Sequence, residues 1–148
     1  MSERPAVQPG ALQHVKVLDL SRVLAGPWAA QTLGDLGAEV IKVERPGNGD
    51  DTRAWGPPFQ DGVASYYRGL NRNKRSQCLD LSQPAGQARV LELMAQADVV
   101  VENFKVGTME KWGIGYEQMR EELPHLIWCR VTGFGADGPL GGLPGYDA

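Results

Sequence analysis

The sequence predicts an α/β fold: a three-layer, Rossmann-like, mostly parallel sheet with helices on both faces. Two observations support this class. Short apolar runs typical of buried strands alternate with segments in which apolar residues recur at helical spacing. The first strand, helix and strand together take about thirty residues, the length of the βαβ unit that builds parallel sheets. The chain has 148 residues, 42% of them hydrophobic, which is enough for one domain of this kind.

The βαβ unit comes first in the chain. Residues 15–20 (VKVLDL) form the first predicted strand, and a helix follows from Pro27, whose missing N–H would be unpaired in a first helical turn in any case. The helix ends at Gly37, a residue typical of helix C-termini, and residues 38–43 (AEVIKV) are the second strand. Residues 44–63 are a loop rich in glycine and proline, and ordered loops of such length are usually functional.

Strands and helices continue to alternate in the rest of the chain. The clearest signals are a helix start at Ser82 and Pro84 and a helix end at Pro124. The predicted elements are a short helix over 65–70, a short strand over 77–81, a helix over 82–96, a strand over 98–101, short helices over 107–111 and 115–123, and a strand over 126–132. We expect residues 1–11 to form a disordered tail and residues 12–148 to belong to one domain.

Composition argues against several classes of protein. No apolar run approaches the roughly 20 residues of a membrane span, and the N-terminus lacks the apolar core of a signal peptide. We therefore expect a cytoplasmic protein with no membrane partner. Cys78 and Cys129 are too few for a disulfide framework or a zinc site, and we predict no metal site. A formal net charge of −3 argues against nucleic acid as a partner.

One stretch of this acidic chain is basic. Residues 42–75 carry seven Lys and Arg against four Asp and Glu, a net charge of +3. A local excess of this kind suits a small anion better than a long polyanion. Within the stretch, residues 71–76 (NRNKRS) either hold phosphate groups through their cations or are an ordinary solvated run of charge.

Ligands of open α/β sheets bind at the loops that follow the carboxyl ends of the strands. Four such loops are predicted along one edge: residues 21–27, the segment from 44–47 onward, residues 102–104 and residues 133–135. Gly26 either lets backbone N–H groups approach an anion or is the N-cap of an ordinary turn. Asn103 and Phe104 either hold a base or a pantetheine-like arm, or they simply cap their strand. No nucleophile, histidine and acid can be assembled, so these residues indicate a binding edge without catalytic machinery.

A set of short segments, in order and with matching spacing, resembles the N-terminal part of the class III CoA-transferases, the family of formyl-CoA transferase and carnitine CoA-transferase. The likeness covers residues 12–147. Its segments are residues 17–20 with 25–27, residues 36–44, Gly49 and Asp50 with Arg53 and Trp55, residues 73–76 with Leu79 and Asp80, residues 97–99 with 102–104, residues 133–135 with Gly138 and Pro139, and residues 145–147.

The resemblance implies a large CoA-binding domain that takes coenzyme A or acyl-CoA as a substrate, with no tightly bound cofactor. The residues it places against CoA are Val23, Leu24, Ala25, Arg45, Asn73, Lys74, Arg75, Asn103, Phe104, Lys111 and Tyr146. Leu24 stands where formyl-CoA transferase has an amide side chain that helps to hold a small acyl group. This departure disfavours formate and oxalate and suits a different carboxylic acid, such as a dicarboxylic acid. The implied assembly is an interlocked homodimer.

The chemistry that the resemblance implies is covalent. An aspartate carboxylate attacks the acyl-CoA thioester, giving a mixed anhydride and a CoA thiolate; the thiolate then attacks the aspartyl carbonyl, and the incoming acid completes the exchange. In the family this aspartate follows the Gly-Tyr-Asp motif, which ends here at Asp147, so the resemblance places it beyond Ala148. We therefore expect no catalytic residue within this chain, which would be an N-terminal portion without the nucleophile and inactive alone.

Two alternatives to the transferase stay open. Related α-methylacyl-CoA racemases carry a histidine at the position of Tyr146, so the tyrosine favours the transferase over a racemase-like isomerase. The missing nucleophile is equally compatible with a non-catalytic CoA-binding module.

Overall fold

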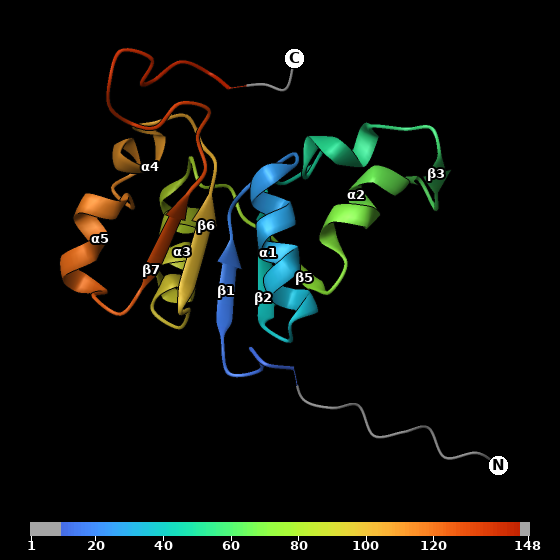
Figure 1. The fold of residues 1–148 in the computed structure, drawn as a ribbon, viewed down its shortest axis with the longest axis horizontal. Coiled ribbons are helices and arrows are strands. Elements are labelled where there is room, and N and C mark those ends of the chain that lie inside the picture. The colour runs from blue at the N-terminus through green and yellow to red at the C-terminus, as the bar shows by residue number, and fades with distance from the viewer. Residues whose placement is uncertain (1–9, 146–148) are drawn as a thin grey trace.

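The computed structural model describes residues 10–145 and contains a five-stranded sheet whose strands are all parallel (Figure 1). The strands are β1 (Lys16–Asp19), β2 (Glu39–Glu44), β5 (Lys74–Cys78), β6 (Val99–Glu102) and β7 (Ile127–Arg130). Their spatial order is β5-β2-β1-β6-β7, so the chain winds outward from β1 in both directions. The predicted α/β class is confirmed, and the topology is that of the doubly wound Rossmann-like sheets.

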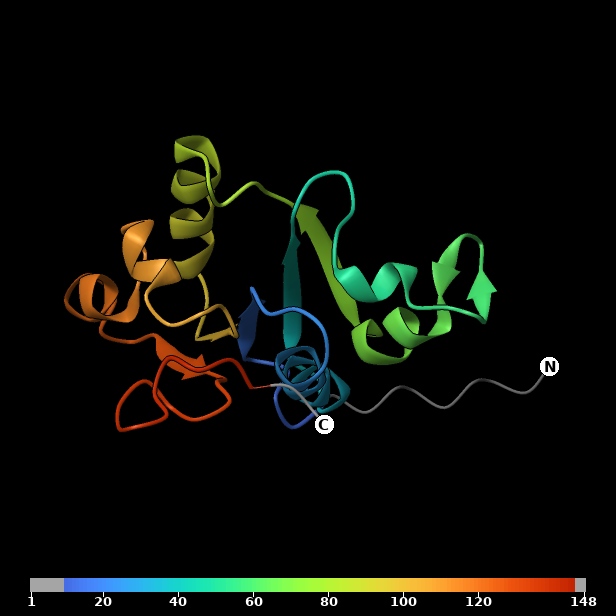
Figure 2. The same ribbon diagram turned by 90° about the horizontal axis from the view of Figure 1, so that it is seen from above.

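Helices cover both faces of this sheet, which gives the three predicted layers (Figure 2). The helix α1 (Ala25–Asp35) lies on one face, and α3 (Pro84–Met94), α4 (Thr108–Lys111) and α5 (Tyr116–Glu122) lie on the other. The helix α2 (Ser65–Asn71) packs beside α1. None of the helices described has the length and apolar character that crossing a membrane requires.

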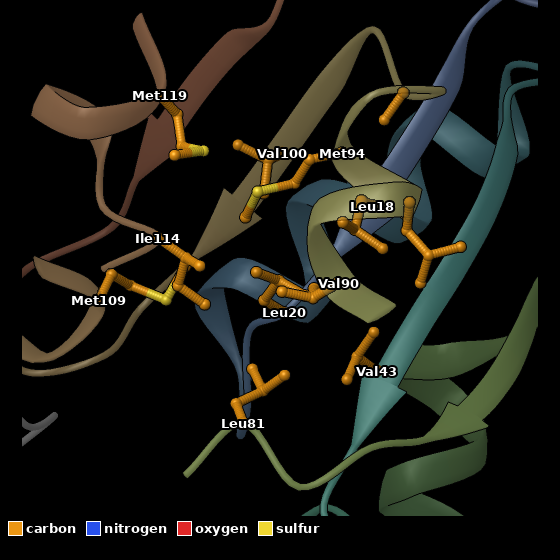
Figure 3. Packing of buried hydrophobic residues seen from close by; sticks show 12 residues of the cluster. Leu18, Leu20, Val43, Leu81, Val90, Met94, Val100, Met109, Ile114 and Met119 are labelled. Carbon is orange, nitrogen blue, oxygen red and sulfur yellow. The ribbon is translucent and has the colours of Figure 1, made fainter. Parts of the chain in front are cut away.

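Alternate residues of the strands supply two apolar cores, one on each face of the sheet. Val17 and Val101 belong to the core beneath α1, whereas Leu18 and Val100 belong to the core beneath the other three helices. The second core is the larger, and methionines of α3, α4 and α5 fill it (Figure 3). Both faces of β1 and β6 are therefore buried, which explains why apolar residues stand at consecutive positions, 17–18 in β1 and 99–101 in β6.

The predicted loop over 44–63 contains short elements of its own. It holds the 3₁₀ turn η1 (Asp51–Ala54) and a small hairpin of β3 (Phe59–Gln60) and β4 (Val63–Ala64). The Asp50 carboxylate accepts the Thr52 N–H and so caps η1.

The strand predicted over 77–81 is misplaced by three residues, since the strand in this region, β5, spans 74–78. Its sequence KRSQC is polar because β5 is an edge strand that is partly exposed on both faces. The apolar residues that suggested a strand, Leu79 and Leu81, instead lie in the loop that follows and pack against the larger core. Gly10 belongs to the expected tail, and its carbonyl accepts the Gln13 N–H; the disorder expected for residues 1–11 stays a prediction. Residues 1–9 of the expected tail lie outside the described residues.

Candidate functional site

The loops that follow the strands meet at one edge of the sheet, the upper edge in Figure 1, which we call the carboxyl edge. The loops begin at residues 20, 45, 79, 103 and 131. The four predicted loops are among them, because all five strands are parallel. The loop over 79–83 was not predicted, because the strand predicted over 77–81 covered most of it.

Asn103 ties two of these loops together. Its Nδ2 donates to the carbonyl oxygen of Arg22 at 2.7 Å, and its Oδ1 accepts the Arg22 N–H at 2.8 Å. The Arg22 guanidinium lies 5.5 Å from the centre of the Phe104 ring, and that ring meets Trp112 edge-on at 5.3 Å. The amide of Asn103 is thus used within the chain, and the Phe104 ring, partly buried, is held between a cation and a second ring.

Beneath the start of α1 lies a group of four buried charges, Asp19, Lys42, Asp50 and Lys74, which we call the charge tetrad. The Lys42 ammonium donates to Asp50 at 2.9 Å and lies 3.9 Å from Asp19. The Lys74 ammonium donates to Asp19 at 2.8 Å. All four side chains are at most 2% exposed, so two cations and two anions neutralise one another out of contact with water.

The tetrad holds the β1–α1 loop in a strained conformation. Val23 has a φ of +71°, a region that β-branched residues rarely adopt. Its N–H points at the Asp50 carboxylate, with oxygens at 3.3 and 3.4 Å, and the Lys42 ammonium donates to the Ser21 carbonyl oxygen at 2.8 Å. Burial opposes ionisation of Asp50, but the positive charge of Lys42 and hydrogen bonds from Thr52 outweigh it and lower the pKa of the carboxyl.

A second buried carboxylate anchors the loop that follows β2. Glu44 is 4% exposed and accepts two hydrogen bonds from Arg53, both at 2.7 Å, one from Tyr67 at 2.8 Å and one from the Ser76 hydroxyl. The backbone N–H of Asp50 adds a fifth at 2.9 Å. Burial alone would raise the pKa of Glu44, but these hydrogen bonds outweigh it and lower the pKa to about 2.

The structure places Asn73 and Arg75 of the NRNKRS segment away from the carboxyl edge. Asn73 and Arg75 lie at the opposite end of the sheet, where they contact Asp35 at the end of α1 and Glu39 at the start of β2. Lys74 is buried in the tetrad, and its ammonium also donates to the Pro27 carbonyl and to Asn71. The contact of these three residues with CoA, which the resemblance implies, stays a prediction.

The cations of the basic stretch are paired within the chain. Each of the seven forms a salt bridge: Lys42, Arg45, Arg53, Arg68, Arg72, Lys74 and Arg75. The Arg45 head group stays on the surface beside Asp51, with 47% of its side chain exposed. Three other cations of the loops and helix at the carboxyl edge, Arg22, Lys105 and Lys111, form no salt bridge within the described part of the chain. Sequence reasoning missed Arg22 and Lys105 because they fall outside the basic stretch.

Leu24 and Ala25 lie at the first turn of α1, at the carboxyl edge. Gly26 is not an N-cap, because it is the second residue of α1, and a Cβ at this position would overlap Ser21. Among residues 10–145, no cluster of three or more His, Cys, Asp or Glu is arranged to hold a metal ion.

Two predictions fall on the last residues of the chain. Tyr146 and Ala148 both lie outside the described residues. The contact of Tyr146 with CoA, and the comparison with the racemases that depends on this tyrosine, therefore stay predictions. The same holds for the expectation that the family aspartate lies beyond Ala148 and that the chain itself carries no catalytic residue.

We expect Gly26→Ala to lower the free energy of unfolding by about 1–3 kcal/mol, because the added methyl group overlaps the Cβ and Oγ atoms of Ser21. Gly69→Ala in α2 is the matched control: its methyl group meets no atom within 4 Å, and stability should rise by up to about 1 kcal/mol. Urea unfolding followed by circular dichroism measures both. Similar changes in the two variants would contradict the close packing of α1 on Ser21.

The chain is similar in sequence to known proteins. The profile of a family described as CoA-transferase family III matches residues 12–148. Succinyl-CoA:glutarate CoA-transferase from Homo sapiens is 54% identical over 137 residues, which are 93% of this chain and 31% of that protein. Succinate–glutarate CoA-transferase from Agrobacterium fabrum is 50% identical over 153 residues, covering 99% of this chain and 38% of that protein.

Solved protein structures also match the fold of this chain. The crystal structure of a CAIB/BAIF family protein from Brucella suis matches with a TM-score of 0.90 and 51% identity, over 95% of this chain and 38% of that one. A hypothetical protein from Mycobacterium tuberculosis matches with a TM-score of 0.86 and 44% identity, over 95% of this chain and 39% of that one. The chain spans 31% to 38% of the length of the curated relatives described above. Because the family profile covers nearly all of its residues, the chain belongs to CoA-transferase family III.

Proposed function

We propose that the chain is the CoA-binding part of an enzyme that moves CoA between an acyl-CoA thioester and a free dicarboxylic acid. The observation that carries this proposal is the carboxyl edge, to which three loops contribute Arg22, Arg45 and Lys105 and α4 contributes Lys111. Guanidinium and ammonium groups suit the phosphates of CoA, and the Phe104 ring suits its adenine or pantetheine arm. Membership of the family supports CoA as the shared substrate.

The relatives support a dicarboxylic acid as the second substrate. Three are named for glutarate, and others for D-citramalate and mesaconate. Leu24, an apolar residue at the first turn of α1, suits an acyl chain longer than a formyl group.

The role of these 148 residues is to bind and orient CoA, and the covalent step belongs to the aspartate that the resemblance places beyond Ala148. We expect the chain alone to show no transferase turnover, and the complete enzyme to act as a cytoplasmic homodimer. Measurable exchange of CoA between succinyl-CoA and glutarate by the isolated chain would contradict this assignment.

Calorimetric titration of the chain with CoA tests the binding site. Arg45→Ala removes an exposed cation from the carboxyl edge, and we expect it to weaken CoA binding about tenfold, the loss of one charge-assisted hydrogen bond. Arg89→Ala is the matched control, since Arg89 is equally exposed but lies on α3 beside Glu92. No heat of CoA binding in the wild-type chain, or equal losses in the two variants, would overturn the proposal.

A further inference from the structure

We infer that the pocket between α1 and α2 receives the acyl chain of the substrate and binds its distal carboxylate through Gln31 and Arg72. The pocket has a volume of about 390 Å³. This lies within the range of small-molecule sites and is ample for a short dicarboxylic acid. The inference rests on the proposed function and adds to it the place where the acid is recognised.

One wall of the pocket is a single face of α1. Leu24, Trp28 and Gln31 follow one another at spacings of four and three residues, so they lie one above another along the helix. Tyr66 and Leu70, four residues apart on α2, form the opposite wall. The walls are mainly apolar, and large parts of Trp28 and Tyr66 are open to solvent at 58% and 40% exposure. Such walls suit a methylene chain.

Gln31 is the unusual residue of this pocket. It is 3% exposed, and its Oε1 has no hydrogen-bond partner among the described residues. A buried amide left unpaired is costly, and nearly all such groups in folded proteins find a partner. The amide can be turned so that its NH₂ group faces the pocket, where a carboxylate would accept from it.

Arg72 supplies the charge at the same end of the pocket. Its guanidinium is held in place by Asp35 and by the Gly69 carbonyl, which accept from Nε, NH1 and NH2. A guanidinium has five N–H donors, so this anchoring leaves donors free for a carboxylate. The polar end of the pocket thus offers one amide and one positioned guanidinium, which Asp35 also contacts.

The pocket joins the carboxyl edge at Leu24. From there to Gln31 the helix rises about 10 Å at 1.5 Å per residue. A carboxylate at Gln31 would therefore belong to an acyl chain of several carbons whose other end reaches the carboxyl edge, where CoA is proposed to bind. A formyl group would leave this length empty, whereas a five-carbon dicarboxylic acid would occupy much of it.

Titration of the ¹⁵N-labelled chain with glutarate, followed by NMR, tests the inference. We expect saturable shifts of the Trp28 indole N–H and the Gln31 side-chain NH₂, and weaker shifts with butyrate, which lacks the second carboxylate. Gln31→Leu should weaken glutarate binding about tenfold, the loss of one hydrogen bond to a charged group. Gln118→Leu, at an exposed position of α5, is the control and should bind glutarate like the wild type.

Two results would overturn the inference. One is the absence of saturable glutarate shifts at Trp28 and Gln31 in the wild-type chain, which tests the pocket without any variant. The other is equal glutarate affinity in Gln31→Leu and Gln118→Leu. A CoA titration of the same samples separates the two proposals, since unchanged CoA binding alongside either result rejects the acid pocket alone. Absence of CoA binding in all samples rejects the proposed function and this inference with it.

Discussion

Lys42→Met is expected to lower the free energy of unfolding by about 3–5 kcal/mol, the largest effect of any single substitution considered for this chain. Methionine matches the length of the lysine stem, so packing changes little. The loss of the ammonium group, however, leaves the Asp50 carboxylate buried at 1% exposure without the cation that lies 2.9 Å away. An unpaired buried carboxylate must either stay charged in the low-dielectric protein interior or take up a proton, and either outcome destabilises the folded state. Urea unfolding measures the loss.

The double variant Lys42→Met/Asp50→Asn separates this electrostatic cause from simple loss of packing. Asparagine keeps the shape of the side chain and its acceptor oxygen, but it removes the orphaned charge. We expect the double variant to be more stable than the sum of the two single changes predicts, with a coupling of at least about 1 kcal/mol. Asp19 keeps Lys74 as its partner in every variant. Strictly additive losses would show that Lys42 acts only through the space it fills.

The same variants bear on the carboxyl edge. Asp50 is the acceptor for the Val23 N–H, and Val23 sits in a backbone conformation that costs of order 1–3 kcal/mol. Strain of that size persists only where the surroundings enforce it, and the tetrad is the nearest group of fixed charges. The buried charges thus shape the first turn of α1, where Leu24 and Ala25 are predicted to meet CoA.

The fold was predictable because its strands and helices carry strong local signals. Residues 17–19 and 100–102 are buried within a parallel sheet, so apolar residues occur there at consecutive positions and not only at alternate ones. The edge strand over 74–78 gave no such signal, because its exposed positions are polar. The apolar residues just after it were mistaken for the strand because periodicity over so few residues cannot distinguish a strand from a packed loop.

The site was predictable only in outline. Parallel topology is enough to gather the loops of Leu24, Arg45 and Asn103 at one edge. Sequence position, however, does not reveal which cations are already paired. Lys42 and Lys74 counted toward a basic stretch, yet both are enclosed beneath α1, since each falls on the strand face that α1 covers. Long-range pairing of this kind depends on strand register, which local patterns do not contain.

Acidification is expected to destabilise the chain through Glu44 between about pH 4.5 and pH 2. The pKa of this carboxyl falls from its ordinary value of 4.5 to about 2 in the folded protein, because the hydrogen bonds from Arg53, Ser76, Asp50 N–H and Tyr67 outweigh burial. A group whose pKa is lowered by folding stabilises the folded state above its unfolded pKa, and this stabilisation is lost as the pH falls through the folded pKa. For Glu44 the amount is at most about 3 kcal/mol.

Glu44→Gln tests this assignment because it removes the titrating group and keeps its shape. At pH 7 the variant should lose up to about 3 kcal/mol of stability, since Arg53 loses its charged partner and Ser76 and Tyr67 lose a strong acceptor.

The decisive measurement is the slope of unfolding free energy against pH. Between pH 4.5 and 2 the slope should be shallower in Glu44→Gln than in the wild type, and unchanged in Glu92→Gln, whose carboxylate is 61% exposed beside Arg89. Asp50, whose pKa is also lowered, titrates in all three proteins. Its contribution cancels in the comparison, so identical acid slopes would mean that the Glu44 cluster does not stabilise the loop after β2 by charge.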